Sequence, residues 1–140
     1  MIRDTIVREA MTWINTPYHH AARIKGVGVD CGQILIAVYS EVGLIDDYVP
    51  DEYPHDWALH RSEERYLHNV LKYAEETERP QKGDIAVYKF GRCISHAGIL
   101  IDDENIIHAH LKTKSVSISG IEEGELNGRL MGFYKIKGID

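Results

Sequence analysis

The 140-residue sequence contains only two cysteines, Cys31 and Cys93. Two cysteines are too few for the disulfide framework that holds small secreted domains together. We therefore expect both to be thiols in a chain that folds in a reducing compartment.

Positive charge and long apolar runs are also scarce. The 16 lysines and arginines are outnumbered by 22 aspartates and glutamates, and a net charge of −6 argues against nucleic acid as a partner. No run reaches the roughly 18 apolar residues of a membrane span. The first residues, MIRDTIVREAMTWINT, lack the apolar core and cleavage site of a signal peptide. We therefore expect synthesis in the cytoplasm without a signal peptide, and no membrane insertion.

The sequence divides into a helical part and a strand-rich part. Apolar residues at helical spacing predict helices over 2–15, 31–42 and 60–77. A glycine-containing loop at 16–30 and an acidic, aromatic excursion at 46–60 separate them. Short β-branched or aromatic runs predict strands over 84–90, 94–101, 105–110, 115–119 and 130–136. This order predicts an α+β fold, with N-terminal helices packed on a C-terminal antiparallel β-sheet, in a single domain over 1–140.

Cys31 stands where the glycine-containing stretch GVGVDCG gives way to a helix pattern. Asp30 is a natural N-cap for that helix, and Gly43 followed by Leu44 suits its C-terminus. A thiol at a helix N-terminus lies at the positive end of the dipole, and a protonated histidine beside it lowers its pKa further. Cys31 is therefore a candidate nucleophile, with a small buried hydrophobe as the other interpretation.

Three of the eight histidines, His96, His108 and His110, fall on predicted strands among apolar neighbours. Because side chains alternate between faces, His108 and His110 share a face. If Ile101 pairs with Ile106, His96 and His108 lie on opposite faces. If the loop holds three or five residues, His96 and His108 share a face as diagonal neighbours. The sequence does not choose between these registers, because one residue of slip inverts every side chain.

A shared face would give Cys31 the two partners that an activated nucleophile needs. His96 would take the thiol proton and later protonate the leaving amine, while His108 would orient the ring of His96. Gly98, on the same face as His96, would keep that face open. The reaction class would then be amide hydrolysis or acyl transfer, and an acyltransferase stays open as an alternative.

A metal site is another interpretation of the same residues. Two histidines in an H-x-H step can both bind an ion, here His108 and His110 with Cys31 or His96. The sequence contains neither CxxC nor HExxH, so we expect no metal and no cofactor.

The order of short motifs resembles that of NlpC-type cell-wall peptidases: TPY, DCG at a helix start, KGDIAVY, SHAGILI and IIHAH. The resemblance runs from about residue 5 to residue 136. It implies a papain-like cysteine peptidase that cleaves the peptide stems of bacterial peptidoglycan. The bond implied is the link between γ-D-glutamate and the diamino acid.

The resemblance also implies roles for individual residues. Cys31 matches the nucleophile, His96 the general base and His108 the third polar residue. Tyr18 of TPY matches a tyrosine whose hydroxyl helps to bind the oxyanion. Asp30 matches an aspartate that in some members also meets the free amine of the stem peptide.

The nucleophile motif departs from the family's usual DCSG or DCAG. It reads DCGQ here, with Gly32 and Gln33 after the cysteine. The serine is not a catalytic group, so the machinery is retained, but the moved glycine changes helix packing or substrate approach. Cys93 has no counterpart in the family, and we expect it to be structural or at the surface.

The KGVGVDC and YxxxW stretches resemble the phage-associated subgroup of these peptidases. That resemblance implies a place in the virion tail, with other tail proteins as partners and the bacterial cell wall as the site of action. The alternative function is a tail assembly component that has the same fold and little or no catalysis.

Overall fold

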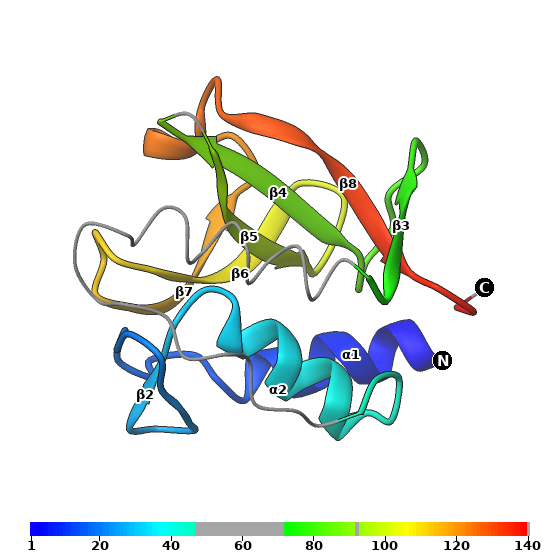
Figure 1. Cartoon of the computed structure of the whole chain (residues 1–140), viewed down its shortest axis with the longest axis horizontal. Coiled ribbons are helices and arrows are strands. Elements are labelled where there is room, and N and C mark those ends of the chain that lie inside the picture. The colour runs from blue at the N-terminus through cyan, green and yellow to red at the C-terminus, as the bar shows by residue number, and fades with distance from the viewer. Residues whose placement is uncertain (47–71, 92, 140) are drawn as a thin grey trace.

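The structure is a computed structural model that describes residues 1–46, 72–91 and 93–139. The described elements form two layers, with the helices α1 (Ile2–Met11) and α2 (Gln33–Glu41) below a six-stranded antiparallel sheet (Figure 1). The main hydrophobic core lies between the layers and draws on both helices and on the central strands. The predicted α+β arrangement is confirmed.

The large sheet has the strand order β3-β8-β4-β5-β6-β7. The five strands predicted in the second half of the chain are confirmed within one residue of their bounds. They are β4 (Ile85–Phe90), β5 (Cys93–Leu100), β6 (Asn105–His110), β7 (Ser115–Gly120) and β8 (Leu130–Ile136). Four short elements complete the described part: β1 (Arg23–Ile24), β2 (Gly28–Val29), β3 (Ala74–Thr77) and the 3-10 helix η1 (Gly124–Leu126).

The helix predicted over 60–77 is wrong at its C-terminal end. Its last four residues form β3 (Ala74–Thr77), which pairs antiparallel with β8 and places Ala74 opposite Ile136. This pairing supplies backbone hydrogen bonds and buries Ala74, and such tertiary context overrides helical spacing in a short segment. Lys72 and Tyr73, also predicted as helix, form a turn. The rest of the prediction, 60–71, and positions 47–60 of the excursion lie outside the described residues.

Helix α1 ends at Met11, four residues sooner than predicted. The chain after it turns, and Asn15 adopts a left-handed conformation with φ of 74°. The N–H of Asn15 then donates to the carbonyl of Val116, whose own N–H donates to the carbonyl of Thr16. Pairing with β7 therefore replaces the last predicted turn of the helix.

Helix α2 is buried on nearly all sides. Its buried residues are Gln33, Ile34, Leu35, Ile36, Val38 and Tyr39. A helix that is apolar around its whole circumference belongs inside the molecule. It ends at Glu41, and Gly43 follows the C-cap Val42 as predicted, with φ of 82°, a conformation that glycine adopts without strain. The N-terminus of α2 is therefore anchored by the packing of the whole helix.

The opposite face of the sheet carries a second, smaller apolar cluster. Its buried members are Ala86, Tyr88, Leu100, Ile106 and Leu126. The sheet curls over this face, as β4 and β8 cross above β5 and β6 in Figure 1. Both faces of the central strands are therefore covered.

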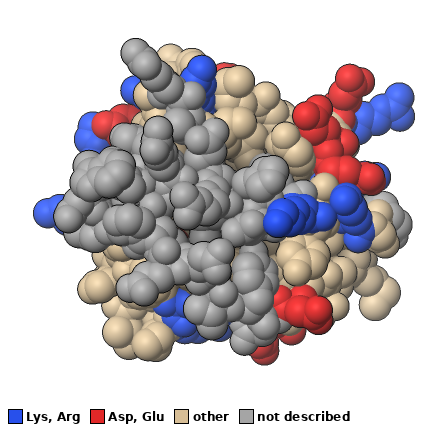
Figure 2. All heavy atoms as spheres, in the orientation of Figure 1, with Lys and Arg blue, Asp and Glu red and all other residues tan. Residues whose placement is uncertain are grey.

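Acidic and basic side chains are interspersed on the face shown in Figure 2, where the described residues form no single large basic patch. Within the described residues, neither helix is long and apolar enough to cross a bilayer.

A buried ion pair ties α1 to the turn before β4. The guanidinium of Arg3 donates to a carboxylate oxygen of Asp84 at 2.7 Å. The other oxygen of Asp84 accepts the N–H of Gln81 at 2.8 Å. In the same turn, the carbonyl of Gly83 accepts the hydroxyl of Tyr39 from α2 at 2.7 Å. This turn therefore connects the sheet to both helices.

We expect Asp84→Asn to lower the free energy of unfolding by about 3–5 kcal/mol, because the buried Arg3 guanidinium loses the carboxylate that balances its charge. Urea unfolding followed by circular dichroism measures the change. Asp4→Asn is the matched control, because Asp4 pairs with Lys82 at the surface, where ion pairs contribute little. Equal losses in the two variants would contradict the buried pair as the connection between the layers.

Candidate active site

Cys31 lies in the turn that leads into α2. The helix begins at Gln33, two residues later than predicted, with Gly32 at its N-cap position. Asp30 still caps the helix start, because its Oδ1 accepts the N–H groups of Gly32 and Gln33 at 3.2 and 2.9 Å. Its carbonyl accepts the N–H of Ile34 at 3.1 Å. Asp30 therefore fixes the backbone on both sides of the thiol.

The carboxylate of Asp30 also holds the preceding loop. Its Oδ2 accepts the N–H of Ala21 at 2.8 Å, and the residue is 3% exposed. Three backbone amides thus bind this one carboxylate, which ties the loop to the start of α2. A contact between Asp30 and the free amine of a substrate stays a prediction.

The thiol of Cys31 reaches the strand that carries His96. Cys31 is a buried thiol, 3% exposed, and its Sγ donates to the carbonyl of Ser95 at 3.6 Å. Ser95 directly precedes His96 on β5. The packing of α2 against the sheet therefore brings the candidate nucleophile to the backbone next to the candidate base.

The β5–β6 hairpin adopts the register in which His96 and His108 share a face. Leu100 pairs with Ile106, so the connection holds the five residues 101–105. Asp102 fixes this turn, because its Oδ1 accepts the N–H of Asn105 at 2.7 Å. The alternative pairing of Ile101 with Ile106 does not occur.

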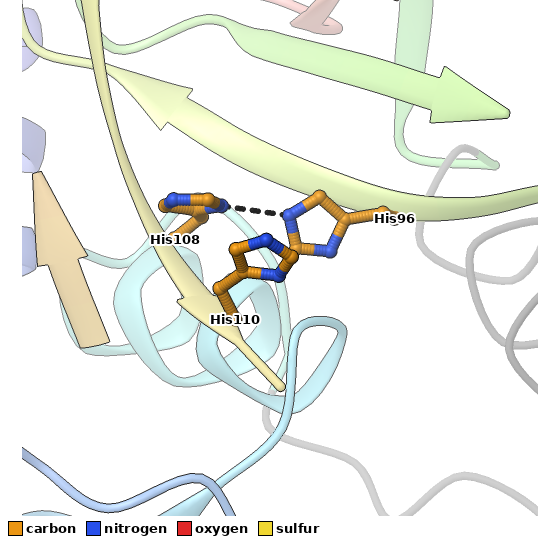
Figure 3. Close-up of side chains that lie close together, drawn as sticks. All are labelled: His96, His108 and His110. Carbon is orange, nitrogen blue, oxygen red and sulfur yellow. Dashed lines mark hydrogen bonds between the residues drawn. The ribbon is translucent and has the colours of Figure 1, made fainter. Parts of the chain in front are cut away.

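His96 and His108 are hydrogen-bonded to each other. The Nε2 of His96 lies 2.7 Å from the Nδ1 of His108, and Figure 3 shows this bond between rings from two adjacent strands. Both residues are buried, with 6% and 1% of their surface exposed. The rings of Tyr88 and Phe90 on β4 pack against His96 with centroids 5.8 and 5.7 Å away. The predicted contact between these two histidines is therefore present, while their roles as base and orienting residue stay predictions.

The environment keeps these imidazoles neutral. Burial, helped by neighbouring His108 and His110, holds the pKa of His96 well below its usual value of 6.5. Burial and His110 lower the pKa of His108 to about 3. A histidine must be neutral to accept a proton, so the pair is in the state that a general base requires.

Gly98 leaves the space that the side chain of Ile106 and the Cβ of His108 occupy. A Cβ at this position would come within 2.7 Å of the Ile106 Cδ1 and 3.2 Å of the His108 Cβ. The predicted role of Gly98, to keep this face open, agrees with these distances.

His110 joins the pair as a third ring that the catalytic prediction left out. It stacks on His108, with centroids 4.9 Å apart and planes at 29°, and it lies 5.2 Å from the ring of His96 (Figure 3). Its Nε2 is 3.5 Å from a carboxylate oxygen of Glu125. Burial lowers the pKa of His110 also, while Glu125 acts in the opposite direction. The alternation of His108 and His110 was the sequence signal for this third ring, whereas nothing in the sequence pointed to Glu125.

The three imidazoles could hold a metal ion. One ring nitrogen from each of His96, His108 and His110 lies within 4.8 Å of the other two. A pocket of about 250 Å³ is lined by two of these histidines, His108 and His110, and by Glu125, among others. The structure thus brings three candidate ligands together, whereas the sequence alone established only that His108 and His110 share a face.

Tyr18 lies in a loop that pairs with two other segments. Its N–H donates to the carbonyl of Lys114 at 2.8 Å, and its backbone bridges to Val29. Its partly buried ring packs on the main core. The role of its hydroxyl at an oxyanion stays a prediction.

Comparisons with a family model and with solved structures point to the same protein family. The model of the NlpC/P60 family matches residues 15–135. The chain is similar in structure to an NlpC/P60 family protein from Bacillus cereus, with a TM-score of 0.70 and 21% identity. The match covers 96% of this chain but spans only 40% of that protein. A comparison with curated proteins gave no match.

Two further solved structures are matched along most of their length. The NlpC/p60 domain of the peptidoglycan hydrolase SagA has a TM-score of 0.64 and 20% identity, with 94% of this chain and 96% of that chain covered. RipD from Mycobacterium tuberculosis, described as a non-catalytic NlpC/p60 domain protein, has a TM-score of 0.64 and 14% identity, with 99% and 98% covered. At these identities the likeness establishes the fold, and it confirms the predicted papain-like architecture.

We expect Gly98→Ala to lower the free energy of unfolding by about 1–3 kcal/mol, because the new methyl group overlaps the buried Ile106 and the base of His108. Urea unfolding measures the loss, and imidazole NMR signals report the displacement of His108. Gly120→Ala on β7 is the matched control, since its methyl group meets the side chain of Glu123 at 3.3 Å and Glu123 is exposed. A similar, small loss in both variants would contradict the close packing around Gly98.

We expect the protein to lose stability as the pH falls from 6.5 toward 4. In this window unfolded histidines bind protons that native His96 and His108 exclude, so the unfolded state gains protons and is favoured. Replacing His108 with Gln removes one such group and should reduce the slope by up to about 1.4 kcal/mol per pH unit. Urea unfolding at several pH values measures the slope.

The control for this pH dependence is His19→Gln, which replaces an exposed histidine in the first loop. The slope should fall further in His108→Gln than in this variant. A slope in His108→Gln that equals that of the unmodified protein would show that His108 takes up protons normally in the fold.

Proposed function

The chain belongs to the NlpC/P60 family, and we propose that it is a cysteine peptidase that hydrolyses the peptide stems of bacterial peptidoglycan. The observation that carries the proposal is the bond of 2.7 Å between His96 on β5 and His108 on β6, together with the contact of the Cys31 thiol with the carbonyl of Ser95, the residue before His96. SagA, whose fold this chain shares, is named a peptidoglycan hydrolase.

The proposed reaction begins with a proton transfer from the thiol. The Nε2 of His96 is engaged by His108, so the Nδ1 of His96 receives the proton of Cys31. The Nε2 then carries a proton and donates to the Nδ1 of His108, which must be unprotonated. His108 therefore acts as an acceptor that orients the ring and stabilises its positive charge.

The thiolate then attacks the carbonyl carbon of the stem peptide. A carbon–sulfur bond forms, and the carbon–nitrogen bond breaks as His96 returns its proton to the leaving amine. Water, deprotonated by His96, then hydrolyses the thioester and releases the acid with the thiol restored. In this scheme the hydroxyl of Tyr18 helps to bind the oxyanion, and Asp30 meets the free amine of the substrate.

The finer proposals concern the bond and the setting. We propose the link between γ-D-glutamate and the diamino acid as the bond cleaved, and a virion tail as the place where the protein acts on the cell wall. The stretches KGVGVDC and YxxxW support this setting through their resemblance to phage-associated members. Other tail proteins would then be partners.

A second candidate function is a tail component with the fold and little or no catalysis. The observations that favour it are the DCGQ motif and the likeness to RipD, which is described as an adaptation to peptidoglycan-binding function. The presence of Cys31, His96 and His108 together favours the peptidase.

We expect Cys31→Ala to abolish cleavage of purified peptidoglycan, because the variant lacks the thiol that forms the proposed thioester. Mass spectrometry of the released fragments measures cleavage and identifies the bond. Cys93→Ala is the matched control and should retain activity. Circular dichroism of both variants checks that the fold is intact.

Two results would decide against this assignment. Cleavage retained by Cys31→Ala would reject the nucleophile. Binding of the unmodified protein to peptidoglycan without any released fragment would favour the non-catalytic function instead.

A further inference from the structure

We propose that His96, His108 and His110 form a binding site for a divalent transition-metal ion of the zinc class, and that the bound ion blocks the proton transfer described above. The metal site stands on the geometry of the three rings alone. The block of catalysis rests in addition on the proposed function.

The three rings come from two adjacent strands and converge on one point. His108 and His110 are two residues apart on β6 and therefore face the same way, and the register of β5 brings His96 to them (Figure 3). One nitrogen from each ring lies within 4.8 Å of the others. In a tetrahedral site with metal–nitrogen bonds near 2.0–2.1 Å, ligand nitrogens are about 3.3 Å apart. Small rotations of the side chains reach that spacing.

The three ligands stand on two strands of the large sheet. Strand β6 pairs with β7 along its whole length, with His108 opposite Ser117 and His110 opposite Ser115, and it pairs with β5 at Ile106 and Ile107, just before the histidines. The rings of His96 and His110 also pack against Phe90. Sites built on strands hold their ligands more precisely than sites on loops, so little ordering is needed when an ion binds.

The donor set and its surroundings select the class of ion. Three imidazoles suit zinc, copper and nickel, whereas magnesium and calcium prefer oxygen ligands. Glu125, near the Nε2 of His110, adds negative charge beside the cluster, partly offset by Lys112 at 3.1 Å from Glu125. Three protein ligands leave the fourth position for water, and the adjoining pocket of about 250 Å³ offers a route to solvent.

Metal binding and catalysis compete for the same ring nitrogens. The hydrogen bond between His96 and His108 joins one N–H to one lone pair at 2.7 Å. An ion held by both rings needs a lone pair from each and a separation near 3.3 Å, so this bond must break. The ion also fixes the tautomer of His96 with a proton on Nδ1, which can then no longer accept the proton of Cys31. An occupied site is therefore an inactive one.

The binding test uses the full chain with Cys31→Ser, which removes the thiol as a metal ligand. Zinc is titrated in competition with a chromophoric chelator. We expect one ion bound per chain, no comparable binding of magnesium, and at least tenfold weaker zinc binding in Cys31→Ser with His110→Gln. Cys31→Ser with His19→Gln is the matched control and should bind zinc as Cys31→Ser does.

Two outcomes of this titration would overturn the site. One is the absence of saturable zinc binding, and the other is equal zinc binding by the His110→Gln and His19→Gln proteins. Circular dichroism of the His110→Gln protein shows whether a loss of binding reflects a loss of fold. If it is unfolded, His110→Asn replaces it, and unchanged zinc binding in that variant would equally overturn the site.

The activity test uses the chain with Cys31 intact. We expect zinc to inhibit peptidoglycan cleavage and EDTA to restore it, and the zinc concentration that halves activity to rise at least tenfold in His110→Gln relative to His19→Gln. Equal sensitivity of the two variants would overturn the proposed block. A protein that cleaves nothing in the absence of metal contradicts the proposed function, while the titration with Cys31→Ser still decides the metal site.

Discussion

The register of the β5–β6 hairpin is the constraint on which the whole site depends. The pairing of Leu100 with Ile106 leaves a five-residue turn and places His96 and His108 on one face. A shift by one residue would send the histidines of the two strands to opposite faces. Asp102 accepts the N–H groups of Glu104 and Asn105 at 2.7 Å, and these bonds stabilise the turn. The exposed carboxylate of Asp102 thus stabilises the turn whose register brings His96 and His108 together in the interior.

The second constraint is the burial of α2. Because this helix is enclosed by the core, its N-terminus is fixed relative to the sheet, and Asp30 fixes the backbone around Cys31. The Sγ of Cys31 meets the carbonyl of Ser95 as a consequence of helix packing. The nucleophile is therefore positioned from the helical layer, and the histidines from the sheet. The Arg3–Asp84 pair and the Tyr39–Gly83 bond, which join the layers, also maintain the distance between the two halves of the site.

Local sequence patterns correctly predicted those features of the fold that depend on neighbouring residues. Strands β4 to β8, the cap at Asp30 and the left-handed Gly43 all follow from alternation or turn chemistry. The prediction was wrong where long-range pairing determines the structure. The segment that begins at Ala74 has helical spacing but pairs with β8 as a strand, and Asn15 bonds to β7 where the sequence predicted more of the first helix. In the site, the residue types and their neighbours pointed to His96 and His108, but the contact between them depends on the register of β5 and β6, which the sequence does not determine. The approach of Glu125 to His110 depends on the chain returning after β7, which no short motif encodes.

Burial also determines how the proposed chemistry can start. In the native protein His96 and His108 are held neutral, so a permanent charge on either ring would be costly. Charge is best created only when substrate is attacked, and two features of the fold then stabilise it. The helix N-terminus at Cys31 favours negative charge on sulfur or oxygen, and the Nδ1 of His108 accepts the N–H of a protonated His96. The buried pair of His96 and His108 is therefore neutral before substrate is attacked. The lone pairs that these neutral rings use in proton transfer are also the lone pairs that would bind the proposed metal ion.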